Sequence, residues 1–493
     1  MRTVFLREWQ HYTRTELASM LATSSEKAAT LLGRLKKNGV VKILRADSEK
    51  EDLYDLAEEG EEIFDPDDLS SEYHYVFVFV GVVVVSGIVL ICYPKYIVNS
   101  SQEELIRKMK QVLRVIRFYS EKESQTVRIY TEPSNAFSYN RLAIIVSLLE
   151  DYYEYGIYES NRDVIEKNGN GRILWDKTIN ETFAYISENR PYYLDLYTHR
   201  RENDQQDFFT RLHESVLTSC SKELGDQMLC DLFEVQGVAL CEESPEDLGD
   251  RVFILDSIEK ELPRQFHTRK QRLLKMLYAY IGNESFLTDL DCFSVYGTNS
   301  FQLVWESVLR EVIGDELHQP IRKIWKRNPD NALYTDPSVH LIDCIAPPWW
   351  VCEKPDGREL CRSVKTLIPD IARYSPKENR FYILDAKYYL TKNRYDMPLS
   401  GQPGIESITK QYLYQLAYKP FLNVFGIASV CNCFLMPTDA PTVEKGGYVR
   451  MDMFRSEGLA LEDIRVRFLP AEAVYELYCQ GRTLDDLSWL QLN

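Results

Sequence analysis

Two acidic residues and a lysine stand close together in residues 367–390, LIPDIARYSPKENRFYILDAKYYL. Fourteen residues separate the Pro-Asp pair that ends at Asp370 from the Asp-Ala-Lys triplet of Asp385 and Lys387. Hydrolysis of a phosphodiester needs a hard cation that neutralises the phosphate and positions water. Mg²⁺ binds one or two carboxylates together with waters, and a lysine can stabilise charge on the phosphate. The set therefore fits metal-dependent phosphodiester cutting, with ordinary charges on a solvated hairpin as the alternative.

The segments around these residues predict a β-hairpin. TLIPDIARY and RFYILDAKYYL are both typical of strands, and SPKEN between them carries the Pro and Asn of a turn. Such a hairpin brings Asp370 beside Asp385, and strand alternation places Asp385 and Lys387 on one face. The triplet has apolar residues on both sides, which predicts a central strand and favours the enzyme over the solvated hairpin.

Two helices flank the hairpin in the sequence. Upstream, NSFQLVWESVLREVIG predicts an amphipathic helix from which Glu306 reaches the same site, with Asp343 in HLIDC as its rival and an exposed helix glutamate as the alternative. Downstream, ITKQYLYQLAYKP predicts a helix with Gln411 and Gln415 on its polar side. A Glu helix, an Asp strand, an Asp-x-Lys strand and a Gln helix follow the order of a PD-(D/E)xK nuclease core.

These patterns define the candidate site. Mg²⁺ is the expected cofactor, with Asp370, Asp385 and Glu306 as its ligands. Lys387 acts on the water or the phosphate, Gln415 is a further active-site candidate, and Gln411 is a weaker one. No Gly-x-x-x-x-Gly-Lys-Ser/Thr segment occurs in the chain, so a nucleotide that drives the protein is expected to bind to another one.

The composition predicts a soluble protein of several domains that does not bind DNA through its overall charge. The chain has 493 residues, 45% of them hydrophobic, and a net charge of −17. Its basic clusters, RQFHTRKQRLLK at 264–275 and IRKIWKR at 321–327, are candidates for DNA backbone contacts or else solvated helix faces. The N-terminus has no apolar signal core, which favours the cytoplasm.

The order of elements predicts an α/β multidomain fold. Residues 1–62 indicate an N-terminal winged helix-turn-helix that contacts DNA or protein. Residues 63–285 indicate a mixed α/β middle domain that begins with a β-hairpin and includes a strand at 126–132. Residues 286–493 hold the C-terminal nuclease core. The apolar run Tyr75–Cys92 is long enough to suggest a membrane span, but its Val and Phe content and the Ser86-Gly87 turn favour a buried hairpin.

Seven segments together resemble the LlaJI-type restriction endonuclease family, relatives of the McrC nuclease subunit. They are VFVGVVVVSGIVLICYPKY, LLEDYYEYGIY, EKNGNGRILWDKTI, SFQLVWESV, LIPDI, YILDAKYY and YLYQLAYKP, in the order of the family. The resemblance implies that this chain cuts double-stranded DNA in a phage-defence system. It also implies a separate McrB-like AAA+ GTPase on which the middle domain docks. A non-catalytic adaptor or transcription regulator that uses the winged helix is the alternative.

Overall fold

The computed structural model describes residues 2–45, 73–98, 100–122, 140–225, 227–282, 293–325, 336–354, 357–362, 365–390, 401–427, 429–455 and 459–490. The chain forms two compact units. The middle unit is Ser134–Ser294, and the composite unit combines Arg2–Pro133 with Val295–Asn493. The structure thus groups the chain differently from the three expected ranges. The boundary near 62 and the strand at 126–132 lie outside the described residues.

The N-terminal helices of the composite unit lie where the sequence predicts them. Thr13 forms a capping box with Glu16 at the first helix, and the Ser24 hydroxyl accepts from the Lys27 N–H at the second. The apolar residues at helical spacing in both helices are buried. These elements are α1 (Arg14–Leu21), α2 (Ser25–Lys37) and the sheet of β2 (His11–Tyr12), β4 (Tyr73–Phe77) and β3 (Val41–Arg45). The helix-turn-helix is confirmed, whereas its assignment as a winged helix stays a prediction.

The apolar run is a hairpin, as predicted. Ser86 and Gly87 both have positive φ and connect β5 (Val80–Val85) to β6 (Ile88–Tyr93). The hairpin lies between two distant strands in the order β1-β6-β5-β12, with β1 (Arg2–Arg7) and β12 (Phe293–Thr298) at the edges. Gly81 on β5 lies so close to β12 that a Cβ would stand 2.1 Å from the Tyr296 carbonyl oxygen. Among the helices that the structure describes, none combines the length and the apolar character needed to span a bilayer.

A five-stranded mixed sheet carries the predicted hairpin. Its order is β15-β16-β17-β19-β18, in which β16, β17 and β19 are mutually parallel and the two edge strands are antiparallel to their neighbours. Phe381 and Ile383 on β16 pack against Tyr418 and Phe421 of helix α14 in one apolar cluster. The bounds are β15 (Ile371–Ser375), β16 (Arg380–Ala386), β17 (Ser429–Thr438), β18 (Glu444–Val449), β19 (Ile464–Pro470), α11 (Phe301–Ile313), α12 (Ile321–Ile324), α14 (Ile405–Phe425) and α15 (Ala471–Cys479), with the separate ribbon β13 (Trp349–Lys354) and β14 (Gly357–Arg362).

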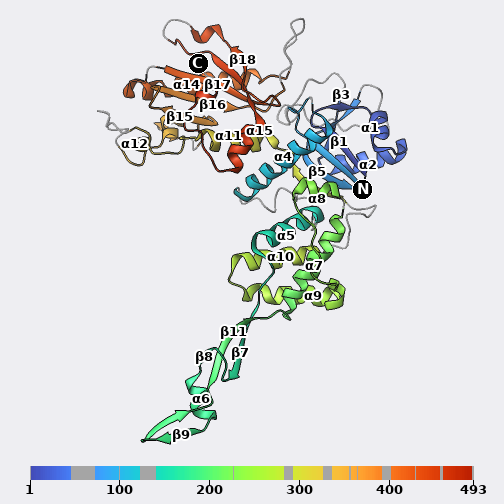
Figure 1. Ribbon diagram of the computed structural model, residues 1–493. Coiled ribbons are helices and arrows are strands. Elements are labelled where there is room, and N and C mark those ends of the chain that lie inside the picture. Colours follow the sequence, from blue (N-terminus) through green and yellow to red (C-terminus); the bar gives the residue numbers. More distant parts are fainter. Residues whose placement is uncertain are drawn as a thin grey trace. The chain divides into compact units, whose positions relative to one another are not determined.

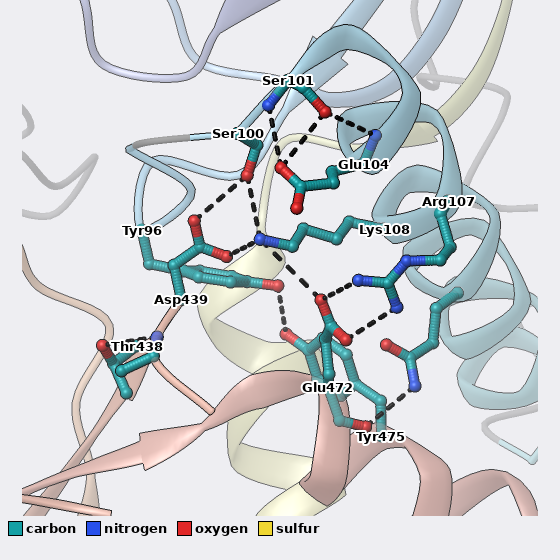
Figure 2. A network of polar contacts seen from close by, with 12 residues as sticks. Tyr96, Ser100, Ser101, Glu104, Arg107, Lys108, Thr438, Asp439, Glu472 and Tyr475 are labelled. Atoms are coloured by element: carbon teal, nitrogen blue, oxygen red, sulfur yellow. Dashed lines mark hydrogen bonds and ion pairs between the residues drawn. The ribbon is translucent and has the colours of Figure 1, made fainter. Parts of the chain in front are cut away.

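A polar network joins helix α4 (Gln102–Lys122) to this sheet (Figure 2). The Lys108 ammonium, mostly buried, donates to the Asp439 carboxylate just after β17 and to Ser100. Arg107 binds the Glu472 carboxylate at the start of α15 through two hydrogen bonds of 2.8 and 3.0 Å. A bidentate pair of this kind fixes orientation as well as distance, so it orients α4 against α15.

The middle unit consists of a helical part and an extended arm (Figure 1). A buried ion pair with N–O distances of 2.7 and 2.8 Å links Arg141 to Glu223 and joins two of the helices. The helices are α5 (Arg141–Tyr155), α7 (Phe208–Leu224), α8 (Gln227–Phe233), α9 (Arg251–Glu261) and α10 (Thr268–Gly282). The arm, residues 161–203, comprises β7 (Asn161–Lys167), β8 (Arg172–Ile173), α6 (Trp175–Glu181), β9 (Ala184–Ser187), β10 (Arg190–Tyr193) and β11 (Tyr197–Asn203).

Candidate active site at the strand fork

The acidic pair of the sequence lies where β15 and β16 separate. Ile371 pairs with Leu384, so Asp370 stands one step before β15 and opposite Asp385. The Asp370 carboxylate accepts a hydrogen bond of 2.8 Å from the Ala386 backbone N–H, which fixes it across the end of β16. The prediction that the hairpin brings these two carboxylates together is confirmed.

Lys387 joins this pair immediately after β16. Its ammonium lies 3.0 Å from the Asp385 carboxylate, as their shared strand face predicts. Its backbone N–H donates to the Leu435 carbonyl at 3.0 Å, which continues the pairing of β16 with β17 by one residue. Asp385 is only 6% exposed, whereas a charge on a solvated hairpin would be open to water. β16 is an internal strand, as predicted.

Glu306 reaches the fork from α11. Its carboxylate accepts a 2.6 Å hydrogen bond from Arg310, and the Arg310 guanidinium also donates to the Asp370 carbonyl at 3.3 Å. The rival Asp343 lies elsewhere, because its half-exposed carboxylate caps a short 3₁₀ helix by accepting from the His340 N–H at 2.7 Å. Arg310 stands one turn after Glu306, a spacing by which sequence reasoning could have found it.

The carboxylates at the fork disturb one another. Burial raises the pKa of Asp370 well above its ordinary value, and the neighbouring Asp385 and Glu306 raise it further. Burial also raises the pKa of Glu306, against the effect of Arg310. The pKa of the Lys387 ammonium is raised, because the surrounding carboxylates outweigh the opposite effect of its burial. Crowded carboxylates of this kind favour a bound proton or a bound cation.

The glutamines of α14 are not on a polar side, and that prediction was wrong. Gln411 is fully buried and Gln415 is 5% exposed. The Gln411 amide donates to the Ile383 carbonyl at 3.1 Å, and the amide of buried Asn432 on β17 lies 3.5 Å from the Gln415 oxygen. Helix α14 packs apolar clusters on two sides, so it has no solvated face at these positions. The two glutamines support the strands beneath the fork.

Sequence reasoning missed Tyr414, which lies one turn after Gln411. Burial raises the pKa of its hydroxyl, and the carboxylates of Asp385, Asp370 and Glu306 raise it further. The hydroxyl donates to the Ile368 carbonyl at 2.9 Å, two residues before Asp370. The sequence offered one signal for it: Tyr414 stands three residues after Gln411 and so lies on the same face of the predicted helix.

The donor set at the fork suits a hard cation. Among the described residues, no three His, Cys, Asp or Glu side chains form a ready-made metal cluster. Mg²⁺ needs fewer, because it binds through one or two carboxylates and keeps several waters. Asp370 and Asp385 supply two adjacent carboxylates, and their mutual repulsion is what a divalent cation would relieve.

Fold and site together define a mixed α/β protein with a carboxylate–lysine site at a strand fork. The chain belongs to the LlaJI restriction endonuclease family, whose model matches residues 79–336 and 344–467, ranges that include every residue of the fork. Membership places it among restriction-system proteins. The YdjA component of the type II restriction enzyme BsuMI from Bacillus subtilis (strain 168) is 28% identical over 422 residues, which are 84% of this chain and 83% of that protein.

Two solved structures are similar at low identity. A chain from an assembly of Thermococcus gammatolerans McrB AAA+ hexamers with bound McrC is 12% identical, with a TM-score of 0.39 over 97% of this chain and 99% of that one. A chain of the Thermococcus gammatolerans McrBC complex is 13% identical, with a TM-score of 0.26 over 62% of this chain and 86% of that one.

Proposed function

We propose that this chain is the Mg²⁺-dependent DNA endonuclease subunit of a restriction complex and that the fork is a PD-(D/E)xK active site. The observation that carries the proposal is the contact of Lys387 with Asp385 beside Asp370, in a chain of a restriction endonuclease family. If the chain were instead a non-catalytic adaptor, Asp370, Asp385 and Lys387 would be expected to be ordinary surface charges. The burial of Asp385 weighs against it, because a buried charge lowers stability unless it has another use.

Each residue at the fork has a chemical role in this proposal. A bound Mg²⁺ supplies charge neutralisation at the phosphate and a more acidic water. Asp370 and Asp385 would hold that cation, with Glu306 as an auxiliary ligand. Lys387 orients the attacking water or stabilises the charge that develops on phosphorus. Gln415 lies beneath the fork, where its side-chain oxygen is 3.5 Å from the Asn432 amide of β17.

The chain is expected to need a partner to hold DNA. Neutralisation of DNA phosphates by basic side chains supplies most non-specific DNA affinity. A chain with a net charge of −17 is expected to have little affinity of this kind. The predicted basic cluster at 264–275 is partly used internally, since Arg269 pairs with Asp151 at 3.0 Å and Lys270 donates to the Glu159 carbonyl at 2.6 Å. We therefore propose a McrB-like AAA+ GTPase as the partner that brings double-stranded DNA to the fork.

The arm of the middle unit is the proposed docking element for that partner. Its end exposes large apolar side chains in a short segment, with Phe183 at 91% and Ile186 at 75% exposure. Further exposed apolar residues of the arm are Trp175, Ile179, Tyr185, Tyr192 and Leu194. A patch of this kind on a soluble protein marks a protein interaction site.

A cleavage time course on plasmid DNA tests the proposal. The subunit is assayed alone, with the GTPase, and with the GTPase plus GTP or a non-hydrolysable analogue, each with Mg²⁺ and with EDTA. Cutting that requires Mg²⁺, the partner and GTP is expected. Efficient cutting by the lone subunit would refute the need for a partner but would leave the nuclease assignment standing. No cutting under any condition would refute the nuclease assignment itself.

A further inference from the structure

A buried charged residue lies in the first turn of the chain, far in sequence from the fork. Glu8 is 3% exposed and stands in the turn between β1 and β2. Its backbone N–H donates to the Tyr93 carbonyl at 2.9 Å, and that of Trp9 donates to the Phe77 carbonyl at the same distance. Trp9 has φ 58°, a left-handed conformation that bulky residues rarely adopt. The turn is therefore held in a specific and unfavourable shape, which aims the Glu8 carboxylate inward.

A second buried charge lies beside it. Lys95 is 2% exposed, and its backbone N–H donates to the Glu8 carboxylate at 3.2 Å. Its ammonium lies over three aromatic rings, 4.8 Å from the centre of Tyr388, 5.4 Å from that of Tyr389 and 5.7 Å from that of Trp9. Aromatic faces attract a cation, and the attraction is stronger away from water. Two of these three rings directly follow Lys387.

Tyr388 connects this cluster to the fork. Its hydroxyl donates to the Glu8 carboxylate at 2.5 Å, across 380 residues of sequence. Its ring also packs against Phe301, with ring centres 5.4 Å apart, at the start of the helix that carries Glu306. The cluster thus contacts the segment that carries Lys387 and the helix that carries Glu306.

Apolar packing alone does not account for this arrangement. A buried carboxylate lowers stability unless hydrogen-bond donors satisfy it. A phenylalanine at position 388 would bury the same ring and would need no buried carboxylate as its partner. The charged cluster is therefore better explained by a need for one defined geometry than by stability. Reaction rates depend on the placement of reacting groups to within about 1 Å, so the segment after β16 must be held firmly.

We propose that Glu8, Lys95 and Tyr388 form a positioning cluster that holds Lys387 in its catalytic geometry. This inference rests on the proposed nuclease function. None of the three touches the reacting atoms: they act through the Lys387–Tyr388 peptide and the backbone bond from Lys387 to Leu435. The N-terminal turn thereby becomes a part of the active site's support.

The test compares Tyr388→Phe, Glu8→Gln and the double variant with wild type. Tyr280→Phe is the matched control, because Tyr280 of the middle unit is as buried as Tyr388 and its hydroxyl also donates to a carboxylate, that of Glu223, at 3.2 Å. Four quantities are measured in the complete complex: the single-turnover cleavage rate with Mg²⁺, DNA affinity with Ca²⁺, thermal unfolding, and hydrogen exchange in residues 385–390.

The single variants are expected to lower the single-turnover rate about tenfold with DNA affinity unchanged, and to increase exchange in residues 385–390. The double variant is expected to be no slower than the slower single variant, because both variants act on the same hydrogen bond between Tyr388 and Glu8. Tyr280→Phe is expected to keep both rate and exchange while losing a similar amount of thermal stability.

Two results would overturn the positioning role. One is wild-type rate and exchange in Tyr388→Phe and Glu8→Gln; the other is an equal effect of Tyr280→Phe on both. If wild type itself fails to cleave, the proposed function fails, and hydrogen exchange still decides whether the cluster holds the segment.

Discussion

At the β15–β16 fork charged side chains are buried, whereas in the arm of the middle unit apolar side chains are exposed. Asp370, Asp385 and Lys387 crowd together under partial or full burial, and Phe183 and Ile186 lie open to solvent. Both arrangements lower the stability of an isolated chain, since folding favours the reverse placement of each residue type.

The difference indicates two kinds of use. Buried carboxylates that repel one another are suited to binding a cation and to catalysis. The reacting groups of such a site all come from this chain. Exposed apolar residues gain nothing until another surface covers them. Variants at the fork should therefore affect chemistry itself, and variants in the arm should affect only what a partner adds.

The largest effect is expected at the fork. Lys387→Met or Asp385→Asn should lower the rate of DNA cleavage by a factor on the order of a thousand or more, because a metal ligand or a charge stabiliser is lost while shape is nearly kept. Single-turnover cleavage by the complete complex measures it. Lys410→Met, which breaks an exposed ion pair with Glu406 on α14, is the control and should keep the rate. Substantial cutting by either fork variant would remove the proposed site.

An intermediate effect is expected in the arm. Phe183→Ser combined with Ile186→Ser should weaken partner binding by about 10- to 100-fold, the usual size for interface anchors, and should reduce partner-stimulated cleavage accordingly. Thermal unfolding of the isolated chain should not change. Val252→Ser, at an exposed apolar residue of α9 outside the arm, is the matched control. Unaltered affinity in the arm variant would show that the partner binds elsewhere.

The smallest effect is expected in the free energy of unfolding, and here the variant should be more stable than the wild type. Because the pKa of Asp370 is raised in the folded protein, its charged form destabilises the fold as pH rises from the ordinary value of 3.8 through the raised one. Asp370→Asn should therefore stabilise the protein in EDTA by about 1 kcal/mol at neutral pH, and by progressively less toward acid pH, while cleavage is lost. Denaturant unfolding at several pH values measures it.

Adding Mg²⁺ should remove the stability advantage of Asp370→Asn, because the cation stabilises only the wild type. The stabilisation should grow as the cation fills the site. Asp343→Asn, a half-exposed cap, is the control. Equal stability of Asp370→Asn and wild type at neutral pH in EDTA would contradict the crowding of carboxylates at the fork.

Local patterns predicted the fork well. The spacing of Asp370, Asp385 and Lys387 follows from a short hairpin, and Glu306 follows from helical periodicity, so neither needs knowledge of distant contacts. The turn at Ser86-Gly87 was predicted correctly for the same reason. The PD-(D/E)xK assignment and the role of Mg²⁺ stay predictions.

The features that were missed depend on contacts between distant segments. The burial of Gln411 and Gln415 follows from apolar clusters on two sides of α14, which residues 408–420 do not reveal. The contribution of Asn432 depends on the parallel pairing of β16 with β17, and that of Glu8 on a contact across 380 residues. No periodic pattern encodes such pairings.

In the sequence, the middle unit is inserted between the two parts of the composite unit, and this order has a consequence for synthesis. β5 can pair with β12 only after the middle unit has been made, and Tyr96 contacts Tyr475 across 379 residues. At roughly 5–20 residues per second, translation delays these contacts by many seconds, and non-local pairing is slow in itself. The middle unit can fold early, while the fork lacks β17, β19 and α14 until late. Under the proposed function, a nascent chain would present its proposed docking arm before its proposed active site is complete, an order that would protect the cell that makes it.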